Sequence, residues 1–366
     1  MAVGTRVLDR RTLNRCTLAR QLLTERVAWP AVEAVRHLVG LQAQEPQEPY
    51  VGLWSRLAGL DPAAASADLE ERRLVRTLLM RRTLHLLTAE DALALRPLHE
   101  DMLRSRMRGT LGPRLPGVDL DQLARVGEPL FATEPRQLTE VGRLVGSTWP
   151  HAAARDLGDA LSTLVPLVQV PPRGLWRRQG PARNTTLRVW LGRDPEAPEG
   201  ALEAMVLRYL RAFGPATSSD LRAWSGLSGL PAVLKRLRPR LAAYRDEAGR
   251  ELLDTDDGVV VPGDAPVPVR FLPAFDNVVL GFSDRSRMID DEHRGLSVLG
   301  ARFLLVDGRV AGTWTSREPV AGGGVEVVVD LFAPLARVER DEVAAEAEAL
   351  ARFLGDGTPG RVRWSS

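Results

Sequence analysis

The sequence has few residues of the kinds that bind metals or form disulfides. Cys16 is its only cysteine, so the chain can form no internal disulfide, and we expect a reducing, cytoplasmic setting. A single thiol also excludes iron–sulfur clusters and cysteine-based zinc sites, and the five histidines include no pair at HxxxH spacing. We therefore expect no metal and no cofactor.

Lysine and long apolar runs are equally scarce. Lys235 is the only lysine, so a mechanism that needs an amine Schiff base has one side chain to use. No run of about eighteen uncharged apolar residues occurs, so we expect no membrane span. At 366 residues, 44% hydrophobic and 26% charged, the chain has the composition of an ordinary soluble protein with several modules.

Positive charge is concentrated in the first third of the chain. Residues 1–116 hold 18 arginines against 13 acidic residues, whereas residues 271–366 hold 11 arginines against 15 acidic residues. The stretch 102–118 contains four arginines and no acid, namely Arg104, Arg106, Arg108 and Arg114. Such a local positive field suits a phosphate backbone, and it is equally typical of a solvated helix end.

The apolar spacing predicts helices followed by a short pair of strands, and this order occurs three times. In the first copy we expect helices over 12–23, 31–41 and 50–57 and strands over 75–80 and 83–87. In the second we expect helices over 137–145 and 152–164 and a hairpin with strands at 168–170 and 175–178. In the third we expect helices over 201–213, 221–224 and 230–237 and a ribbon at 252–253 and 259–261. Thr217-Ser218-Ser219-Asp220 offers an N-cap for the second of these helices. These copies predict three winged-helix units, over residues 1–118, 119–200 and 201–266.

The last part of the chain, residues 267–366, is rich in β-forming residues. We expect strands over 269–272, 278–280, 301–306, 310–314 and 325–331. Asp307-Gly308 is a hairpin signal, and a closing helix follows over 339–353. The sequence predicts a small antiparallel barrel or sheet here, and an α+β fold for the whole chain.

Two uncharged amides, Gln42 and Gln44, flank Ala43 where the second predicted helix ends, and the residues on both sides are apolar. An amide placed against a core is costly unless it forms hydrogen bonds. One interpretation is that the two side chains cap the helix end by bonding its exposed carbonyl groups. The other is that they bind a water molecule and a substrate. The residues alone leave both interpretations open.

Four segments carry a family resemblance: Leu41-Gln42-Ala43-Gln44, Pro49-Tyr50-Val51-Gly52-Leu53-Trp54-Ser55-Arg56-Leu57, Thr83-Leu84-His85-Leu86-Leu87 and Leu272-Pro273-Ala274-Phe275-Asp276-Asn277-Val278. Together they resemble the AlkZ-type (YcaQ-like) winged-helix DNA glycosylases. These bacterial enzymes release alkylated purines and unhook interstrand crosslinks, and they include antibiotic self-resistance enzymes. The resemblance implies tandem winged helices that form a concave DNA-binding face, with a β-rich, barrel-like C-terminal module. Gln42-Ala43-Gln44 meets the family signature of two glutamines separated by one residue.

The resemblance implies hydrolysis of the N-glycosidic bond in N7-alkylated guanine. Alkylation gives the base a positive charge, so it leaves without protonation through an oxocarbenium-like transition state. Gln42 and Gln44 would hold a water molecule against the sugar. Since Lys235 lies far along the chain, we expect a monofunctional enzyme that leaves an abasic site. We expect a monomer acting on double-stranded DNA; the alternative is a non-catalytic winged-helix DNA-binding protein or transcription regulator.

Other polar residues are weaker candidates. Ten basic side chains are candidate DNA contacts, although each is also explicable as plain surface or, for the histidine, as a half-buried strand residue: Arg81, Arg82, His85, Arg104, Arg106, Arg108, Arg173, Arg177, Arg285 and Arg287. Arg81 and Arg82 fall in the first predicted wing turn. Asp276 and Asn277 are expected to cap the backbone. Glu45 and Glu48 are alternative bases, but adjacent carboxylates are more typical of solvated surface.

Overall fold

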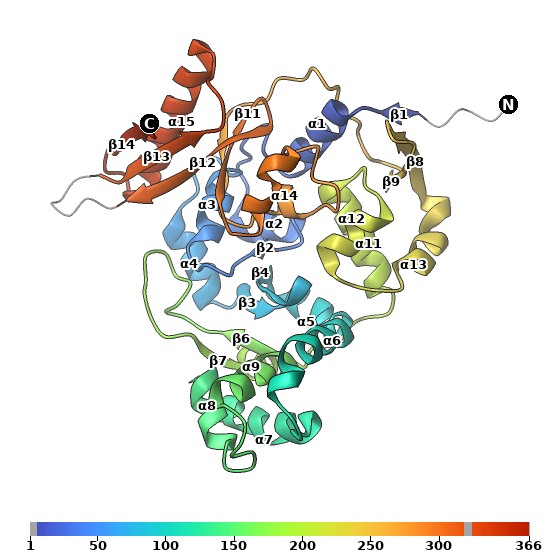
Figure 1. Ribbon diagram of the computed structural model, residues 1–366, viewed down its shortest axis with the longest axis vertical. Coiled ribbons are helices and arrows are strands. Elements are labelled where there is room, and N and C mark those ends of the chain that lie inside the picture. The colour runs from blue at the N-terminus through green and yellow to red at the C-terminus, as the bar shows by residue number, and fades with distance from the viewer. Residues whose placement is uncertain (1–5, 318–323, 366) are drawn as a thin grey trace.

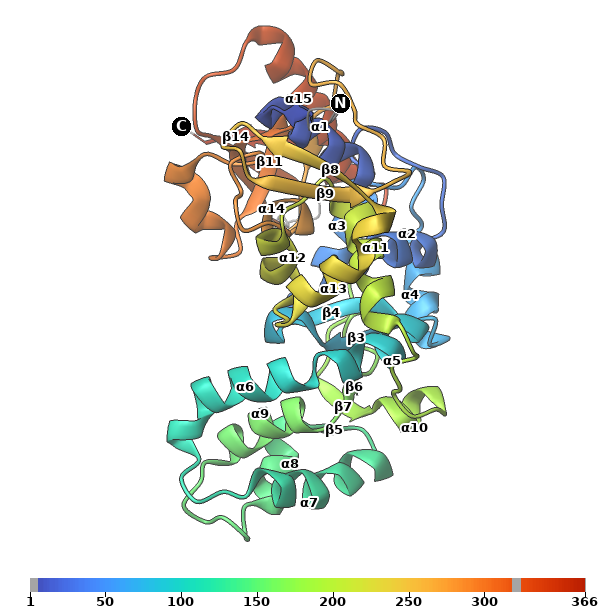
Figure 2. The same cartoon turned by 90° about the vertical axis from the view of Figure 1, so that its right-hand side faces the viewer.

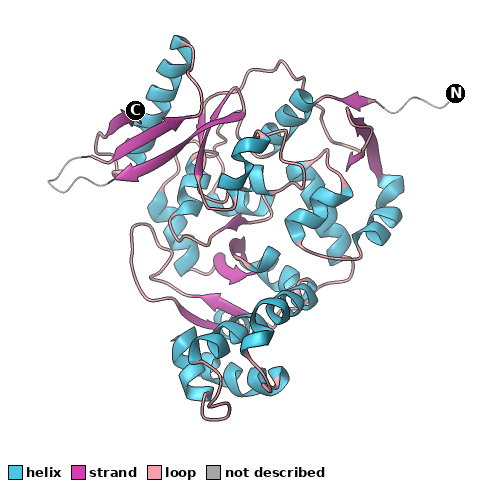
Figure 3. Cartoon of the chain, in the orientation of Figure 1, coloured by secondary structure: helices cyan, strands magenta, loops and turns pink. Residues whose placement is uncertain are grey.

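The computed structural model describes residues 6–317 and 324–365, in which helices surround three separate sheets (Figure 1, Figure 3). The sheets contain three, six and five strands. The predicted α+β class is confirmed. Within the described ranges, none of the helices combines the length and apolar character needed to cross a bilayer.

The N-terminal part leads through two helices into the strand that carries the glutamine motif. Asp9 caps α1 (Arg10–Arg20) by accepting the N–H of Thr12, and Pro30 precedes α2 (Ala31–His37). α2 ends at His37 rather than at Leu41, because Val39 and Gly40 have φ values of 54° and 93° and turn the chain into β2 (Leu41–Gln42). Two further helices follow, α3 (Glu48–Trp54) and α4 (Pro62–Glu70).

The glutamine motif lies at the edge of the six-stranded sheet, whose strands come from two of the predicted units. β2 pairs with β4 (Leu84–Thr88), and β4 with β3 (Leu74–Leu78) across the short turn η1 (Met80–Arg82). β3 then pairs with β6 (Leu167–Gln169), and the sheet continues through β7 (Arg183–Thr186) to β5 (Arg136–Gln137). The first predicted strand pair is confirmed. The predicted strand 175–178 is wrong, because Leu175 and Trp176 pack on the core beside Tyr50 and β6 pairs with β7.

Below this sheet, helices form a lobe that occupies the bottom of Figure 2. Its elements are α5 (Ala89–Leu98), α6 (Glu100–Leu111), η2 (Gly112–Arg114), α7 (Leu120–Thr133), α8 (Leu138–Val145), α9 (Ala154–Leu164) and α10 (Leu187–Leu191). The predicted α8 and α9 are confirmed. They cross closely, since a Cβ on Gly142 would lie 1.9 Å from the carbonyl oxygen of Ala154 and one on Gly158 would lie 2.2 Å from that of Leu138. Only glycine permits this backbone approach.

The third predicted unit starts with α11 (Ala201–Phe213), α12 (Ser218–Ser225) and α13 (Leu230–Leu237). The predicted cap is confirmed, since Thr217 and Asp220 form a capping box at the start of α12. A ribbon follows η3 (Arg238–Arg240): β8 (Leu241–Asp246) pairs with β9 (Glu251–Thr255) and, on its other side, with β1 (Val7–Leu8). The predicted partner strand 259–261 is wrong, because this segment lies against α1, where Val261 N–H meets Cys16 Sγ at 3.3 Å.

The C-terminal sheet has the order β10 (Arg270–Phe271), β11 (Arg302–Val306), β12 (Arg309–Arg317), β13 (Glu326–Leu331), β14 (Arg361–Trp364). Its strands form an open sheet rather than a barrel in the part of the chain described, and β14 joins parallel to β13 after α15 (Arg337–Leu354). Residues 278–280, predicted as a strand, belong to α14 (Asn277–Leu280), because Asp276 caps that turn by accepting the N–H of Val278. The short helix η4 (Asp291–Ser297) precedes β11.

Candidate functional site

Gln42 ends the edge strand β2 and Gln44 lies in the bend that follows, so neither is at a helix end. Gln42 is opposite His85 on β4, and the N–H of Ala43 donates to the carbonyl oxygen of Leu84 over 2.7 Å. Alternate residues of an extended segment point to the same face. Accordingly, Ala43 is fully buried, while Gln42 is half-buried and Gln44 is exposed. The helix-cap interpretation is therefore wrong, because α2 ends at His37 and both amides lie beyond the turn at Gly40.

Two buried side chains hold the backbone around this motif. Nδ2 of Asn277 donates to the carbonyl oxygen of Gly40 over 2.8 Å, and Nη2 of Arg76 donates to that of Ala43 over 2.8 Å. Arg76 is 1% exposed and also bonds Oε1 of Gln169 on β6. Burial, reinforced by the neighbouring charge of Arg173, lowers the pKa of Arg76 to about 10. The motif is thus fixed from both sides. A lone arginine inside the apolar strand β3 was the sequence signal for this role.

Arg81 fixes the side chain of Gln42. Its Nη2 donates to Gln42 Oε1 over 2.9 Å, and its Nη1 donates to the carbonyl oxygen of Trp224 at the end of α12 over 2.6 Å. A carboxamide oxygen has two lone pairs, so one remains on Gln42 for a further donor. Gln44 Oε1 accepts only a long contact, 3.4 Å, from the N–H of Leu84.

Arg81 belongs to a row of positive charges next to the motif. Burial and the nearby guanidinium groups of Arg285 and Arg106 lower the pKa of Arg81 to about 10. Burial and the charge of Arg294 lower the pKa of Arg285 in the same way. We call Arg106, Arg81, Arg285 and Arg294 the arginine row. The sequence predictions included three of these residues and missed Arg294, which lies on η4.

Two predicted DNA contacts are buried. His85 is 0% exposed, its Nδ1 donates to the carbonyl oxygen of Thr83, and burial lowers its pKa to about 3. Arg287 is 6% exposed, bonds the carbonyl oxygen of Pro215 and stacks on Phe282. Neither side chain can reach a phosphate in this conformation, because the core covers both. Both side chains therefore support the core rather than a DNA-binding surface.

The remaining predicted arginines have partners outside the motif. Arg82 pairs with Asp159, and Arg104 with Glu100 and Asp121, so acids from outside the stretch 102–118 offset part of its charge. Arg173 bonds the carbonyl oxygen of Gly180. Arg177 pairs with Asp356 beyond α15, which places it against the C-terminal module rather than on a second wing. Arg108 on α6 is exposed.

One alternative base, Glu48, and the predicted cap Asp276 have structural roles. Glu48 is 3% exposed, pairs with Arg302 and accepts the N–H of Ala274 over 2.6 Å, so it joins α3 to the C-terminal module. Asp276 accepts both a backbone cap and a buried bidentate ion pair from Arg56, at 2.8 and 2.9 Å. Glu45 is exposed.

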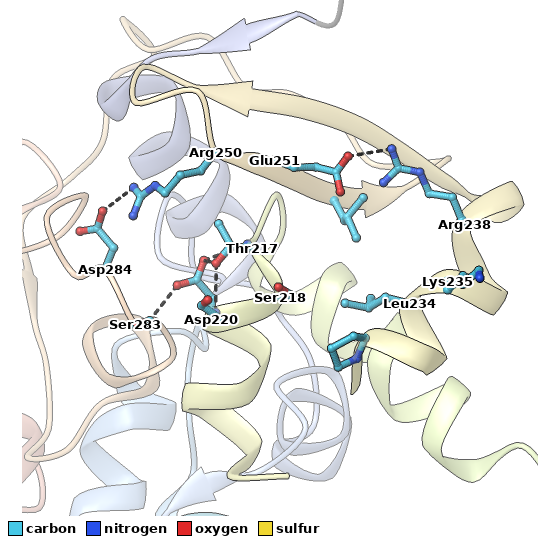
Figure 4. A pocket seen from close by; sticks show the side chains of 13 residues that line it. Thr217, Ser218, Asp220, Leu234, Lys235, Arg238, Arg250, Glu251, Ser283 and Asp284 are labelled. Carbon is cyan, nitrogen blue, oxygen red and sulfur yellow. Dashed lines mark hydrogen bonds and ion pairs between the residues drawn. The ribbon is translucent and has the colours of Figure 1, made fainter. Parts of the chain in front are cut away.

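A cavity of about 720 Å³ lies between α12, α13, β9 and the loop at Ser283 and Asp284 (Figure 4). Its lining includes Lys235 but neither glutamine. Most of the charges around it are paired with one another, Arg238 with Glu251 and Arg250 with Asp284. The cavity is therefore a feature separate from the motif. Among the described residues, no cluster of three or more histidine, cysteine or acidic side chains has the geometry to hold a metal ion.

Residues 35–353 match the AlkZ-like family, described as DNA glycosylase AlkZ-like. The chain belongs to this family. An interstrand DNA cross-link repair glycosylase of Streptomyces sahachiroi is 26% identical over 373 residues, which cover 92% of this chain and 94% of that protein. The solved structure of Streptomyces sahachiroi DNA glycosylase AlkZ matches with a TM-score of 0.80 at 23% identity, covering 98% of this chain and 100% of that one. The resemblance seen in the sequence is confirmed, and the AlkZ-like chain is assigned to the DNA repair glycosylases.

Proposed function

We propose that this AlkZ-like chain is a monofunctional glycosylase that hydrolyses the N-glycosidic bond of N7-alkylated purines in double-stranded DNA. Gln42 and Gln44 hold the attacking water, Arg81 orients Gln42, and the other members of the arginine row bind phosphates beside the lesion. The observation that carries this proposal is the placement of Gln42 at the end of the edge strand β2 and of the exposed Gln44 two residues beyond it, with the carbonyl of Gln42 fixed by Arg81.

For this reaction the protein mainly has to position the attacking water. An N7-alkylated guanine carries its own positive charge, so it departs without a general acid. The oxygen of Gln42 has a free lone pair, and Gln44 is exposed beside it, so both can accept hydrogen bonds from one water molecule. Holding that water near the anomeric carbon removes part of the entropic barrier. Neutral amides are too weakly basic to activate water for attack on an unmodified nucleotide. The reaction is therefore restricted to nucleotides whose nucleobase already carries a positive charge.

The arginines of the arginine row would repel a cationic lesion unless negative groups lay between them. Phosphates on either side of the damaged nucleotide supply this negative charge, and they are the groups that arginine binds best. The arginine row and the exposed Arg108 on α6 therefore orient the duplex, while the cationic base meets the neutral glutamines.

The proposed DNA surface follows the three predicted winged-helix units, 1–118, 119–200 and 201–266, arranged as a concave face. The helix pairs α8–α9 and α12–α13, each followed by a strand or ribbon, support this assignment. The first two units share the six-stranded sheet, so they would bind DNA as one rigid body. The C-terminal module, 267–366, supports the motif through Asn277.

The single lysine supports hydrolysis without strand cleavage. A lyase step needs an amine at the abasic sugar. Lys235 lies on α13 and lines the cavity of Figure 4, whose lining contains neither Gln42 nor Gln44. We propose that the product is an intact abasic site and that the enzyme acts as a monomer in the cytoplasm, where bacterial DNA lies.

The Streptomyces relative is named for interstrand cross-link repair, and we propose crosslinks and bulky N7 adducts as substrates here too. The test is a base-release assay with duplexes that carry N7-methylguanine, a bulky N7 monoadduct or a crosslink, and with unmodified duplex as control. We expect release from modified DNA alone, and no covalent adduct on borohydride trapping. Sequence-specific binding without release would instead identify a regulator and overturn the proposal.

A further inference from the structure

Two large apolar side chains are exposed side by side directly after η4. Val298 is 62% exposed and Leu299 is 80% exposed. Leaving such side chains in water forfeits the stabilisation that burial would give them. An adjacent exposed pair marks a contact surface more often than a single exposed residue does. We call Val298 and Leu299 the apolar tip.

The residues on both sides of the apolar tip are held by packing and an ion pair. At the acidic end of η4, Asp290 pairs with Arg309 and the ring of His293 stacks on Phe332 with centroids 3.7 Å apart. On the other side of the tip, Gly300 has a φ of 81° and lies so close to Phe275 that a Cβ would be 2.8 Å from the ring. Both ends are thus packed against the C-terminal module, and the two apolar side chains are held outward.

The apolar tip lies near residues that neighbour the partners of the glutamine motif. Ser297, next to the tip, accepts a hydrogen bond from Arg285, which neighbours Arg81, the partner of Gln42. Phe275, under the tip, is two residues from Asn277, which holds the carbonyl of Gly40. In Figure 2 the orange segment ahead of β11 projects from the same side of the molecule as α6.

The charges around the apolar tip indicate which kind of partner it contacts. Arg285 and Arg294 adjoin it through Ser297, whereas the acids Asp290, Asp291 and Glu292 lie at the other end of η4, where Asp290 pairs with Arg309. An apolar point with cationic flanks is complementary to stacked bases between two phosphate backbones. A purely apolar partner would leave both guanidinium groups without counter-charge.

We propose that Val298 and Leu299 form a wedge that inserts between base pairs beside the lesion, while Arg285 and Arg294 hold the flanking phosphates. This inference rests on the proposed function and adds a residue pair to it. Insertion unstacks the damaged nucleotide and exposes its sugar to the water at Gln42 and Gln44. Since both side chains are solvated in the free protein, replacing them leaves the fold intact.

The test uses a duplex with N7-methylguanine and an adjacent 2-aminopurine, whose fluorescence rises on unstacking. We compare the full-length protein with the double variant Val298→Ser/Leu299→Ser and with the control Val338→Ser, which changes a 69% exposed valine on α15. The wild type and the control are expected to raise the fluorescence. The double variant is expected to abolish the rise and to slow single-turnover base release from duplex at least about tenfold, with release from single strands unchanged.

Two results separate the wedge from the glycosylase proposal. The fluorescence measurement is repeated in the Gln42→Ala/Gln44→Ala background, so that it reports unstacking without chemistry. A double wedge variant that unstacks and releases base like the wild type overturns the wedge alone. Absence of release by the wild type, with the fluorescence rise still dependent on Val298 and Leu299, overturns the glycosylase proposal and supports the wedge.

Discussion

Nη2 of Arg81 donates to Oε1 of Gln42 over 2.9 Å while Nη1 donates to the carbonyl oxygen of Trp224 over 2.6 Å. One guanidinium therefore joins the edge strand β2 to the end of α12. Arg81 reaches both acceptors from the turn η1, where its φ is 56°. A left-handed conformation at a side chain this large is costly, and the two hydrogen bonds offset that cost.

Replacing Arg81 should impair chemistry more than binding. Arg81→Ala removes a charged donor to Gln42, a contact of about 1.5–3 kcal/mol, so we expect single-turnover base release to fall about 10–100-fold. Arg81→Lys should not restore the rate, because a single ammonium cannot reproduce the two-pronged geometry. Arg82→Ala is the matched control, since Arg82 bonds Thr163 and Asp159 instead. Equal losses in the two alanine variants would contradict a positioning role for Arg81.

The buried pair of Arg56 and Asp276 should be required for stability. Their side chains are 0% and 1% exposed, and Asp276→Asn leaves the guanidinium without its counter-charge. We expect the free energy of unfolding to fall by about 3–5 kcal/mol in urea titrations. Glu33→Gln, at a 52% exposed carboxylate that pairs with the exposed Arg36, should cost about 1 kcal/mol or less. A small loss at Asp276 would show that the pair is not needed to hold the segment beside the motif.

Buried histidines should make the protein sensitive to acid. Burial, with the charge of Arg81 as a second cause, lowers the pKa of His85 from 6.5 to about 3, and burial lowers that of His99 to about 4. Below pH 6.5 these histidines bind protons in the unfolded chain but not in the folded chain. The free energy of unfolding is therefore highest above pH 6.5 and decreases as the pH falls towards the folded pKa values. Each histidine contributes a slope of about 1.4 kcal/mol per pH unit.

The variant His85→Phe tests this directly. Urea unfolding at a series of pH values between about 4 and 7 should show a shallower pH dependence than in the wild type, whatever the absolute stability of the variant. An unchanged slope would mean that His85 is protonated in the folded protein. The control is Val338→Ser on α15, which changes no titratable group and should leave the slope as it is.

Local signals predicted much of the fold. The periodic segments at α11 and α13, the hairpin of β3 and β4, and the cap at Thr217 all appear where the sequence placed them. Errors arose where tertiary contacts overrode local preference. Residues 278–280 look like a strand, yet the cap at Asp276 makes them helical, and the run at Leu175 fills a core position instead of pairing.

Only part of the site could be predicted, because the rest depends on tertiary contacts. Gln42 and Gln44 were identified because two amides among apolar residues are unusual, but their backbone conformation depended on the turn at Gly40. Sequence could not place Arg294 beside Arg285, nor show that His85 is fully buried, because both facts depend on packing between distant segments.

The central claim is that Gln42 and Gln44 together hold the water that cleaves the glycosidic bond. The most direct measurement is single-turnover release of N7-methylguanine from duplex DNA by the wild type, Gln42→Ala, Gln44→Ala and the control Gln122→Ala on α7. We expect each motif variant to lose at least about 100-fold in rate while binding the duplex nearly as well, and the control to match the wild type. Release at the wild-type rate by both Gln42→Ala and Gln44→Ala would contradict the claim.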